Sequence, residues 1–219
     1  MPKHFTPQDH YYHQAKKDGY RARSAYKLTE LLKKFPKFLR RGSNVLDIGS
    51  APGSFLQVLG EKNNGGKVIG VDLQKIKKFP KNYPAELHLI EGDIFEETTA
   101  NAIFEIVGNR KLDAITSDLA PKTSGIKDVD QWKSIELNQR VLEICEKFLK
   151  PNGNLIAKIF RGEDFDEFWV EEFRGQFRDA KTFKPNSCRD RSFEFFMIGI
   201  GYKGGAREKK EEHDYDSEK

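Results

Sequence analysis

The chain is predicted to fold as one α/β domain around a seven-stranded, mostly parallel sheet with one antiparallel strand and helices on both faces. From residue 44 onward, short runs rich in β-branched residues alternate with longer stretches of helical periodicity. This alternation is typical of a parallel sheet whose strands are joined by helices. The last two runs are separated only by residues 185–192, too few for a crossover helix, so these two strands must pair antiparallel at the sheet edge.

The expected strands, in chain order, are residues 44–48, 67–72, 86–91, 112–117, 153–160, 180–184 and 193–202. Apolar residues recur at helical spacing in two stretches, one before the fifth strand and one between the fifth and sixth strands. The first of these stripes consists of Val141, Ile144, Cys145, Phe148 and Leu149 and is followed by the turn Pro151-Asn152-Gly153. The second consists of Phe165, Phe168, Trp169, Phe173 and Phe177. Both stripes are predicted to be core.

Length and composition exclude several classes of protein. A chain of 219 residues with 17 Phe and 37% hydrophobic residues can bury a substantial core, which excludes a wholly disordered protein. No apolar run is long enough to span a bilayer, and the N-terminus lacks the pattern of a secretory signal. The two cysteines, Cys145 and Cys188, form no C-x-x-C pair, and the histidines are scattered. We therefore expect a cytoplasmic monomer with no membrane segment and no metal.

The positive charge is concentrated near the N-terminus. Residues 1–41 contain eleven Lys and Arg against three acids, a net charge of +8, which leaves −4 for the remainder of a chain whose total is +4. Tyrosines lie among these cations, and RNA binding requires cations next to aromatic rings. The alternative is that the run of positive charge is the solvated face of a helix. The expected organisation is a basic RNA-binding segment over 1–41, a catalytic domain over 42–204 and a disordered charged tail over 205–219.

A glycine-containing loop follows the first predicted strand, in the sequence Asp47-Ile48-Gly49-Ser50-Ala51-Pro52-Gly53-Ser54-Phe55. Such a loop at a helix N-terminus forms a ligand cradle. It does not match the dinucleotide fingerprint G-x-G-x-x-G, because Ala51 and Ser54 occupy the places of the second and third glycines. A nicotinamide dehydrogenase is therefore not expected.

Two acids follow the next two strands. Asp72 closes the second strand 19 residues after Gly53, where an acid binds ribose hydroxyls, and Asp93 follows the third strand. Each acid alone could be a helix cap. Together with the loop they favour S-adenosylmethionine as the cofactor.

Three charged residues stand at the ends of, or inside, later strands. Asp118 follows the fourth strand, in the crevice where open α/β sheets bind ligands. Lys158 and Glu194 interrupt strands that are otherwise apolar. Because a lone buried cation is costly, Lys158 requires an acidic neighbour.

With these motifs, residues 10–203 resemble the FtsJ/RrmJ (RlmE) family of ribose 2′-O-methyltransferases. The resemblance is carried by QAKKDGYRARSAYKL at 14–28, D-x-G-x-x-P-G at 47–53, SDLAP at 117–121 and the strand around Lys158. It implies a Rossmann-like methyltransferase fold and a catalytic tetrad of Lys27, Asp118, Lys158 and Glu194. It also implies that the cofactor binds at Asp47, Gly49, Pro52, Gly53, Phe55, Asp72, Asp93 and Asp118. The predicted RNA-binding residues are Lys16, Lys17, Arg21, Arg23, Tyr26 and Lys27.

Two departures from the family pattern lie in the glycine loop. Bacterial members have Pro-Gly-Gly-Trp where this chain has Pro52-Gly53-Ser54-Phe55. Ser54 suits a helix N-terminus and Phe55 keeps a ring, so we expect altered packing rather than lost binding.

The resemblance implies an S-adenosylmethionine-dependent RNA 2′-O-ribose methyltransferase acting on a uridine of the A loop of large-subunit (23S) ribosomal RNA, within the large subunit. Alternatives are methylation of the tRNA anticodon loop and a catalytically silent RNA-binding ribosome-assembly protein. Two mechanisms remain open: Lys158 is the base, or it stays charged and orients the hydroxyl while Asp118 guides the proton away.

Overall fold

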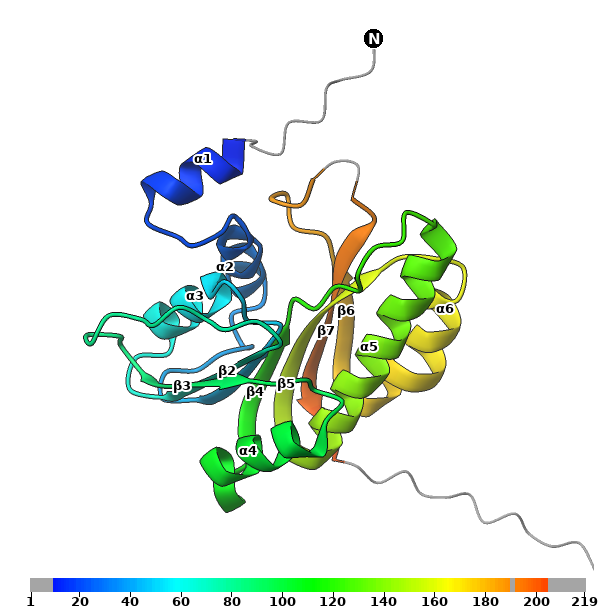
Figure 1. The fold of residues 1–219 in the computed structure, drawn as a ribbon. Helices are drawn as coiled ribbons and strands as arrows, with labels where there is room; N and C mark the ends of the chain where they lie inside the picture. The colour runs from blue at the N-terminus through cyan, green and yellow to red at the C-terminus, as the bar shows by residue number, and fades with distance from the viewer. Residues whose placement is uncertain (1–9, 190–191, 205–219) are drawn as a thin grey trace, which may run out of the picture.

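The computed structural model describes residues 10–189 and 192–204 (Figure 1). The tail predicted over 205–219 and the first nine residues of the basic segment therefore lie outside the described residues. Within the described part of the chain, no helix is both long and apolar enough to cross a membrane.

The strands are β1 (Asn44–Ile48), β2 (Lys67–Asp72), β3 (Glu86–Glu91), β4 (Leu112–Ser117), β5 (Leu149–Phe160), β6 (Phe177–Phe183) and β7 (Glu194–Tyr202). The helices are α1 (His10–Lys17), α2 (Ser24–Lys34), α3 (Ser54–Lys62), α4 (Glu97–Val107), α5 (Lys127–Phe148) and α6 (Phe165–Phe168). Short helical turns are Gly108–Arg110, Trp169–Phe173, which is a π-helical turn, and Arg174–Gln176.

The seven strands form one sheet in the order β3-β2-β1-β4-β5-β7-β6. Pairing is parallel from β3 to β5, whereas β7 runs antiparallel to both of its neighbours. The prediction of a mostly parallel sheet with one reversed strand is confirmed.

Two strands begin several residues before their predicted starts, and the other strand boundaries differ from prediction by at most one residue. β5 begins at Leu149, which pairs with Leu112 across a register shift, and β6 begins at Phe177, which pairs with Tyr202. Assigning these two residues to helical stripes was therefore wrong. Ladder hydrogen bonds with a neighbouring strand override the local helical spacing.

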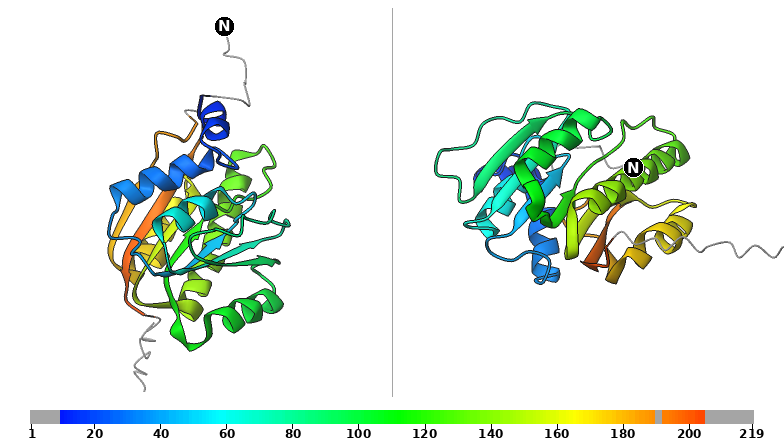
Figure 2. Two further views of the ribbon diagram at one scale, coloured as in Figure 1. Left: turned by 90° about the vertical axis from the view of Figure 1, so that its left-hand side faces the viewer. Right: turned by 90° about the horizontal axis from the view of Figure 1, so that it is seen from below.

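Helices cover both faces of the sheet (Figure 2). On one face, α2 and α3 pack against the strands through a cluster that includes Leu28, Leu31, Phe55 and Leu56. On the other face, α4, α5 and α6 enclose a larger cluster. The predicted aromatic stripe lies in this second cluster, where Phe165, Phe168, Phe173 and Phe177 are each no more than 4% exposed. Its assignment to the core is confirmed.

One rim of the sheet collects the carboxyl ends of the parallel strands, and we call it the carboxyl rim. Because β7 runs in the opposite direction, its first residue lies at this rim rather than at the far one. Glu194 accordingly pairs with Phe160, the last residue of β5. Residues at strand ends and residues at the start of β7 therefore share one edge of the molecule.

Replacing Phe173 by Ala is expected to lower the free energy of unfolding by about 3–5 kcal/mol, because the ring is fully buried and its removal leaves a cavity. Phe104→Ala, at a ring that is 52% exposed on α4, is the matched control and should change it by less than about 0.5 kcal/mol. Urea denaturation of both variants measures the difference. Equal losses in the two variants would contradict the packing of this stripe.

Candidate active site

The glycine loop joins β1 to α3 at the carboxyl rim. Its first two backbone N–H groups, at Gly49 and Ser50, donate to the Val71 carbonyl at 2.9 and 3.1 Å. The next, at Ala51, donates to Asp72 Oδ2 at 2.8 Å. The loop is thus bound to the end of β2, and Asp72 contributes to shaping it.

Two glycines of this loop have positive φ values, 75° at Gly49 and 107° at Gly53. Neighbouring residues also fill the space that a side chain would need. A Cβ on Gly49 would lie 2.9 Å from the Leu119 side chain, and one on Gly53 would lie 2.8 Å from Arg21 Nη1. Glycine is therefore required here for backbone conformation and for close packing of the protein on the loop.

Arg21 binds the glycine loop to the segment that follows β2. Its guanidinium donates to the carbonyl oxygens of Pro52, Lys77 and Lys78 at 3.0, 2.7 and 2.8 Å. It also stacks on Phe79, with 3.7 Å between Cζ and the ring centroid. This arginine was predicted to contact RNA, but in the structure its donors are directed to the protein's own backbone.

The segment fixed by Arg21 is itself basic. Four exposed lysines lie between β2 and β3, namely Lys75, Lys77, Lys78 and Lys81. The net charge of residues 42–219 is negative, so the total charge gives no sign of this local cluster. The signal that could have revealed it was the local run of lysines between two predicted strands.

Acids follow neighbouring strands along the rim. Asp72 ends β2, Asp93 comes two residues after β3, and Asp118 directly follows β4. Asp72 also accepts from the Gln74 N–H at 2.8 Å, and Asp93 accepts from the Phe95 N–H at 3.0 Å. Asp93 is not a helix cap, since the N-cap of α4 is Glu96. The predicted cofactor acids therefore lie along one edge, beside the glycine loop.

Two of the remaining predicted cofactor residues, Asp47 and Phe55, are buried beneath the loop, whereas Pro52 is exposed. Asp47 is fully buried and accepts from Thr116 Oγ1 at 2.7 Å. Phe55 is 3% exposed and packs in the cluster beneath α3, while Ser54 shares a hydrogen bond of 2.7 Å with Ser24. The ring of Phe55 and the hydroxyl of Ser54 thus support the loop from below.

Burial raises the pKa of Asp47 to about 8, against the opposing effect of its hydrogen bond from Thr116. Its Oδ2 atom is buried without a hydrogen-bond partner. A neutral, protonated carboxyl is the form that such a position tolerates at neutral pH.

The four predicted catalytic side chains meet at the rim. Lys158 Nζ, from β5, lies 3.0 Å from Asp118 Oδ1 and donates to the Asp118 carbonyl at 2.6 Å. Lys27 Nζ, from α2, lies 2.8 Å from Glu194 Oε1 at the start of β7. Lys158 is 6% exposed and Lys27 is 9% exposed, so both cations are largely withdrawn from water.

The two ion pairs also interact with each other. Burial lowers the pKa of Lys27, but the charges of Asp118 and Glu194 raise it by more, and the net shift is upward. Lys27 is therefore positive at neutral pH and lies between two carboxylates. The result is a cluster of alternating charge in the order Glu194, Lys27, Asp118 and Lys158.

Cys188 adjoins the Lys27–Glu194 pair. Burial, followed by the charge of Glu194, raises the pKa of this thiol to about 12. It stays protonated and donates a hydrogen bond to the Glu194 carboxylate.

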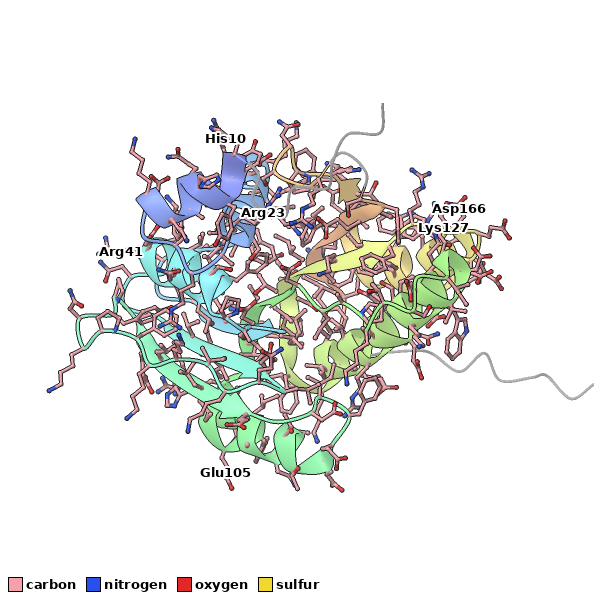
Figure 3. The ribbon with its side chains drawn as sticks, turned by 45° about the horizontal axis from the view of Figure 1, so that its top comes forward. His10, Arg23, Arg41, Glu105, Lys127 and Asp166 are labelled. Atoms are coloured by element: carbon pink, nitrogen blue, oxygen red, sulfur yellow. The ribbon has the colours of Figure 1, made fainter. Side chains whose placement is uncertain are left out.

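The loop between β6 and β7 is held against α2 near this cluster. Glu30 accepts from the N–H groups of Asn186 and Ser187 at 2.7 and 2.9 Å. Arg23 donates to the Ser187 carbonyl. Figure 3, with the carboxyl rim turned forward, shows Arg23 on the α2 side of the rim and Lys127 on the opposite side.

The other residues predicted to bind RNA differ in exposure. Lys16 and Lys17, at the end of α1, are exposed. Tyr26 is half-buried and donates to Asp18 at 2.7 Å, and its ring contacts Tyr11 and Tyr20. Among the described residues, no group of three or more His, Cys, Asp or Glu side chains is arranged to hold a metal ion.

Arg21→Ala is expected to accelerate amide hydrogen exchange in residues 77–83, because the segment loses two hydrogen bonds and one ring contact, and the bond from Arg21 to Pro52 that ties it to the glycine loop is also lost. Arg41→Ala, at an exposed arginine, is the control and should leave the segment unchanged. Mass spectrometry of exchanged peptides provides the measurement. Unchanged exchange in Arg21→Ala would show that another contact holds the segment.

Asp47→Asn is expected to become progressively more stable than the parent chain between pH 4 and pH 8. The pKa of Asp47 is raised from 3.8 to about 8 on folding. The folded state therefore retains a proton that the unfolded state releases, and parental stability falls as pH rises through this window, by up to roughly 5 kcal/mol. Urea denaturation across the window tests this, with Asp166→Asn, at an exposed carboxyl, as control. Parallel stability profiles for Asp47→Asn and the parent would refute it.

Comparison with known proteins agrees with this geometry. The family model described as FtsJ-like methyltransferase matches residues 20–202. A curated relative from Methanosphaera stadtmanae, named ribosomal RNA large subunit methyltransferase E, is 41% identical over 91% of this chain and 95% of its own. A relative of the same name from Pseudomonas fluorescens is 40% identical over 90% of this chain and 91% of its own.

A solved structure has the same fold over most of the chain. It is titled as a ribosomal RNA methyltransferase from Plasmodium falciparum, with a TM-score of 0.73 and 30% sequence identity, and it covers 84% of this chain and 100% of its own. Since the family model and the relatives each span most of the sequence, this chain belongs to the FtsJ-like methyltransferase family.

Proposed function

We propose that this protein is an S-adenosylmethionine-dependent methyltransferase that modifies a ribose 2′-hydroxyl of large-subunit ribosomal RNA, with a uridine of the A loop as its target. The observation that carries the proposal is the cluster of Lys27, Asp118, Lys158 and Glu194 beside the glycine loop. The names of the relatives supply the class of RNA. The proposal includes action as a cytoplasmic monomer on the large ribosomal subunit.

The glycine loop and the acids along the rim are suited to hold the cofactor. Asp72 would accept from its ribose hydroxyls and Asp93 from the exocyclic amine of its adenine, while Gly49 and Gly53 allow the loop to turn sharply beside it. When bound there, S-adenosylmethionine supplies an electrophilic methyl group on a sulfonium sulfur. Asp118 lies where this site adjoins the catalytic cluster.

Lys158 is suited to orient the nucleophile. As an ammonium it has three N–H donors, of which one donates to the Asp118 backbone carbonyl at 2.6 Å. The Asp118 carboxylate lies 3.0 Å away as an ion pair, and among the described residues its Oδ1 atom has no hydrogen-bond partner. A further donor of Lys158 is available for the 2′-oxygen of a ribose. This arrangement favours the second of the two mechanisms considered above, in which Lys158 stays charged and the Asp118 carboxylate accepts the hydroxyl proton as the oxygen–methyl bond forms.

Lys27 and Glu194 would position the target nucleotide. The raised pKa of Lys27 keeps its ammonium charged, and Glu194 fixes its direction at 2.8 Å. Groups held in place before the substrate arrives need no reorganisation during the reaction. Because the methyl group is already activated, this positioning is the main contribution that the protein can make to lowering the barrier.

Exposed lysines from two parts of the chain would bind the RNA backbone. Lys16 and Lys17 belong to the basic segment over 1–41, and the lysines between β2 and β3 are joined to that segment through Arg21. Clustered cations of this kind bind phosphates without reading sequence. We retain the proposal that residues 42–204 form the methyltransferase domain and that the N-terminal segment contributes RNA binding.

The test incubates the protein with methyl-labelled S-adenosylmethionine and large ribosomal subunits or tRNA from a strain that lacks the enzyme. We expect label in large-subunit RNA at a ribose of the A loop. Label in tRNA alone would favour the anticodon-loop alternative, and absence of label from both RNAs would favour a silent RNA-binding protein.

In the same assay, Lys158→Ala is expected to lower the rate of methyl transfer by at least about 100-fold, because the nucleophile loses its positioned donor. Its affinity for S-adenosylmethionine, measured by calorimetric titration, should stay within about twofold of the parent value. Lys181→Ala, at an exposed lysine on β6, serves as control. Loss of cofactor binding in Lys158→Ala would contradict a role of Lys158 in the chemical step.

A further inference from the structure

A cavity of about 620 Å³ lies at the carboxyl rim beside the catalytic cluster. Its walls come from the start of α5, the ends of β5 and β6, and the beginning of β7. Residues that line it include Lys127, Asp128, Arg161, Glu163, Phe193 and Glu194. Lys127 marks its α5 side in Figure 3.

The cavity has a definite place in the order of sites along the rim. The proposed cofactor residues are at β3, β2, β1 and β4, the catalytic cluster is at β4, β5 and β7, and the cavity is at β5, β7 and β6. Glu194 belongs to both the cluster and the cavity wall. The cavity therefore adjoins the reacting group on the side away from the cofactor.

The lining of the cavity suits a nucleotide. Phe193 is 37% exposed, and its ring is held edge-to-face against Phe160 with 5.0 Å between centroids. The Arg161 N–H donates to the Phe193 carbonyl at 3.0 Å, which fixes the backbone that presents this ring. A fixed, partly exposed ring offers a surface on which a base can stack.

Charged side chains line the same cavity as this ring. Lys127 and Arg161 are exposed and can pair with phosphates, while the carboxylates of Asp128 and Glu163 can accept from base N–H groups. A bare anion would not require the acids or the ring. The volume lies within the range of small-molecule sites and accommodates a nucleotide.

We propose that this cavity receives a base of the substrate RNA strand next to the methylated ribose, stacked on Phe193 with its flanking phosphates at Lys127 and Arg161. This inference rests on the proposed function, since it presumes that RNA reaches the catalytic cluster. The cavity would then fix the position of the RNA strand along the protein, so that the correct ribose lies at Lys158.

Phe193→Ala and Arg161→Ala test the proposal. With large ribosomal subunits from a strain that lacks the enzyme, each variant should raise the Kd for this RNA substrate and the KM for methyl transfer. For Phe193→Ala the increase should be between about 5- and 100-fold, the usual effect of losing one stacked base. Phe193→Trp should restore binding to within about threefold of the parent value, because it keeps a ring.

Matched controls replace the same residue types at positions far from the rim. Phe104→Ala removes an exposed ring of α4, and Arg110→Ala removes an exposed arginine just before β4. Both should leave the RNA Kd within twofold. Thermal melting and calorimetric titration with S-adenosylmethionine should show that Phe193→Ala is folded and keeps its cofactor affinity.

The outcomes separate this inference from the proposed function. If the parent protein methylates RNA but Phe193→Ala and Arg161→Ala keep the parental Kd and KM, the cavity is not an RNA site and the proposed function stands. If the parent methylates no RNA, the proposed function fails, and the Kd values alone decide whether RNA occupies the cavity. Equal weakening in the two control variants would also overturn the inference.

Discussion

A lysine inside a buried strand is stable only beside a carboxylate, and the organisation of the carboxyl rim follows from this requirement. Lys158 is 6% exposed within β5, and its partner Asp118 directly follows the adjacent parallel strand β4. The reversed direction of β7 places Glu194 at the same rim, where it pairs with Lys27 from α2. Alternation of charge through the four groups lets two buried cations coexist in a small volume.

The basic N-terminal segment divides its charge between internal contacts and exposed side chains. Part of its charge is used inside the protein, since Arg21 donates to three backbone carbonyls and Arg23 to a fourth. These contacts connect the glycine loop, the lysine-rich segment after β2 and the loop before β7 to the helices that precede the sheet. The remaining exposed lysines are free to meet phosphates. A net charge of +8 therefore overstates what the segment offers to RNA.

Along the rim, the proposed sites follow the order of the strands rather than the order of the sequence. The proposed sites for the cofactor, the nucleophile and the neighbouring RNA base lie at successive ends of β-strands. Asp118 lies at the boundary between the first two sites and Glu194 at the boundary between the last two. Because a rigid sheet sets these spacings, the proposed sites would position the reactants with little free energy spent on rearrangement. The reversed strand is essential to this layout, since a parallel β7 would carry Glu194 to the far edge.

Sequence alone determined the strand pattern, the reversal of the last strand, the glycine loop and the acids at strand ends, because local periodicity and turn chemistry encode these features directly. The family motifs predicted the four side chains of the proposed catalytic cluster. Only the tertiary structure decided that Phe177 begins a strand, that Arg21 holds Lys77 across 56 residues of sequence, and that Arg161 and Phe193 share a cavity. Each of these depends on contacts between segments distant in the chain, and the side chains of one segment do not specify which other segment will cover them.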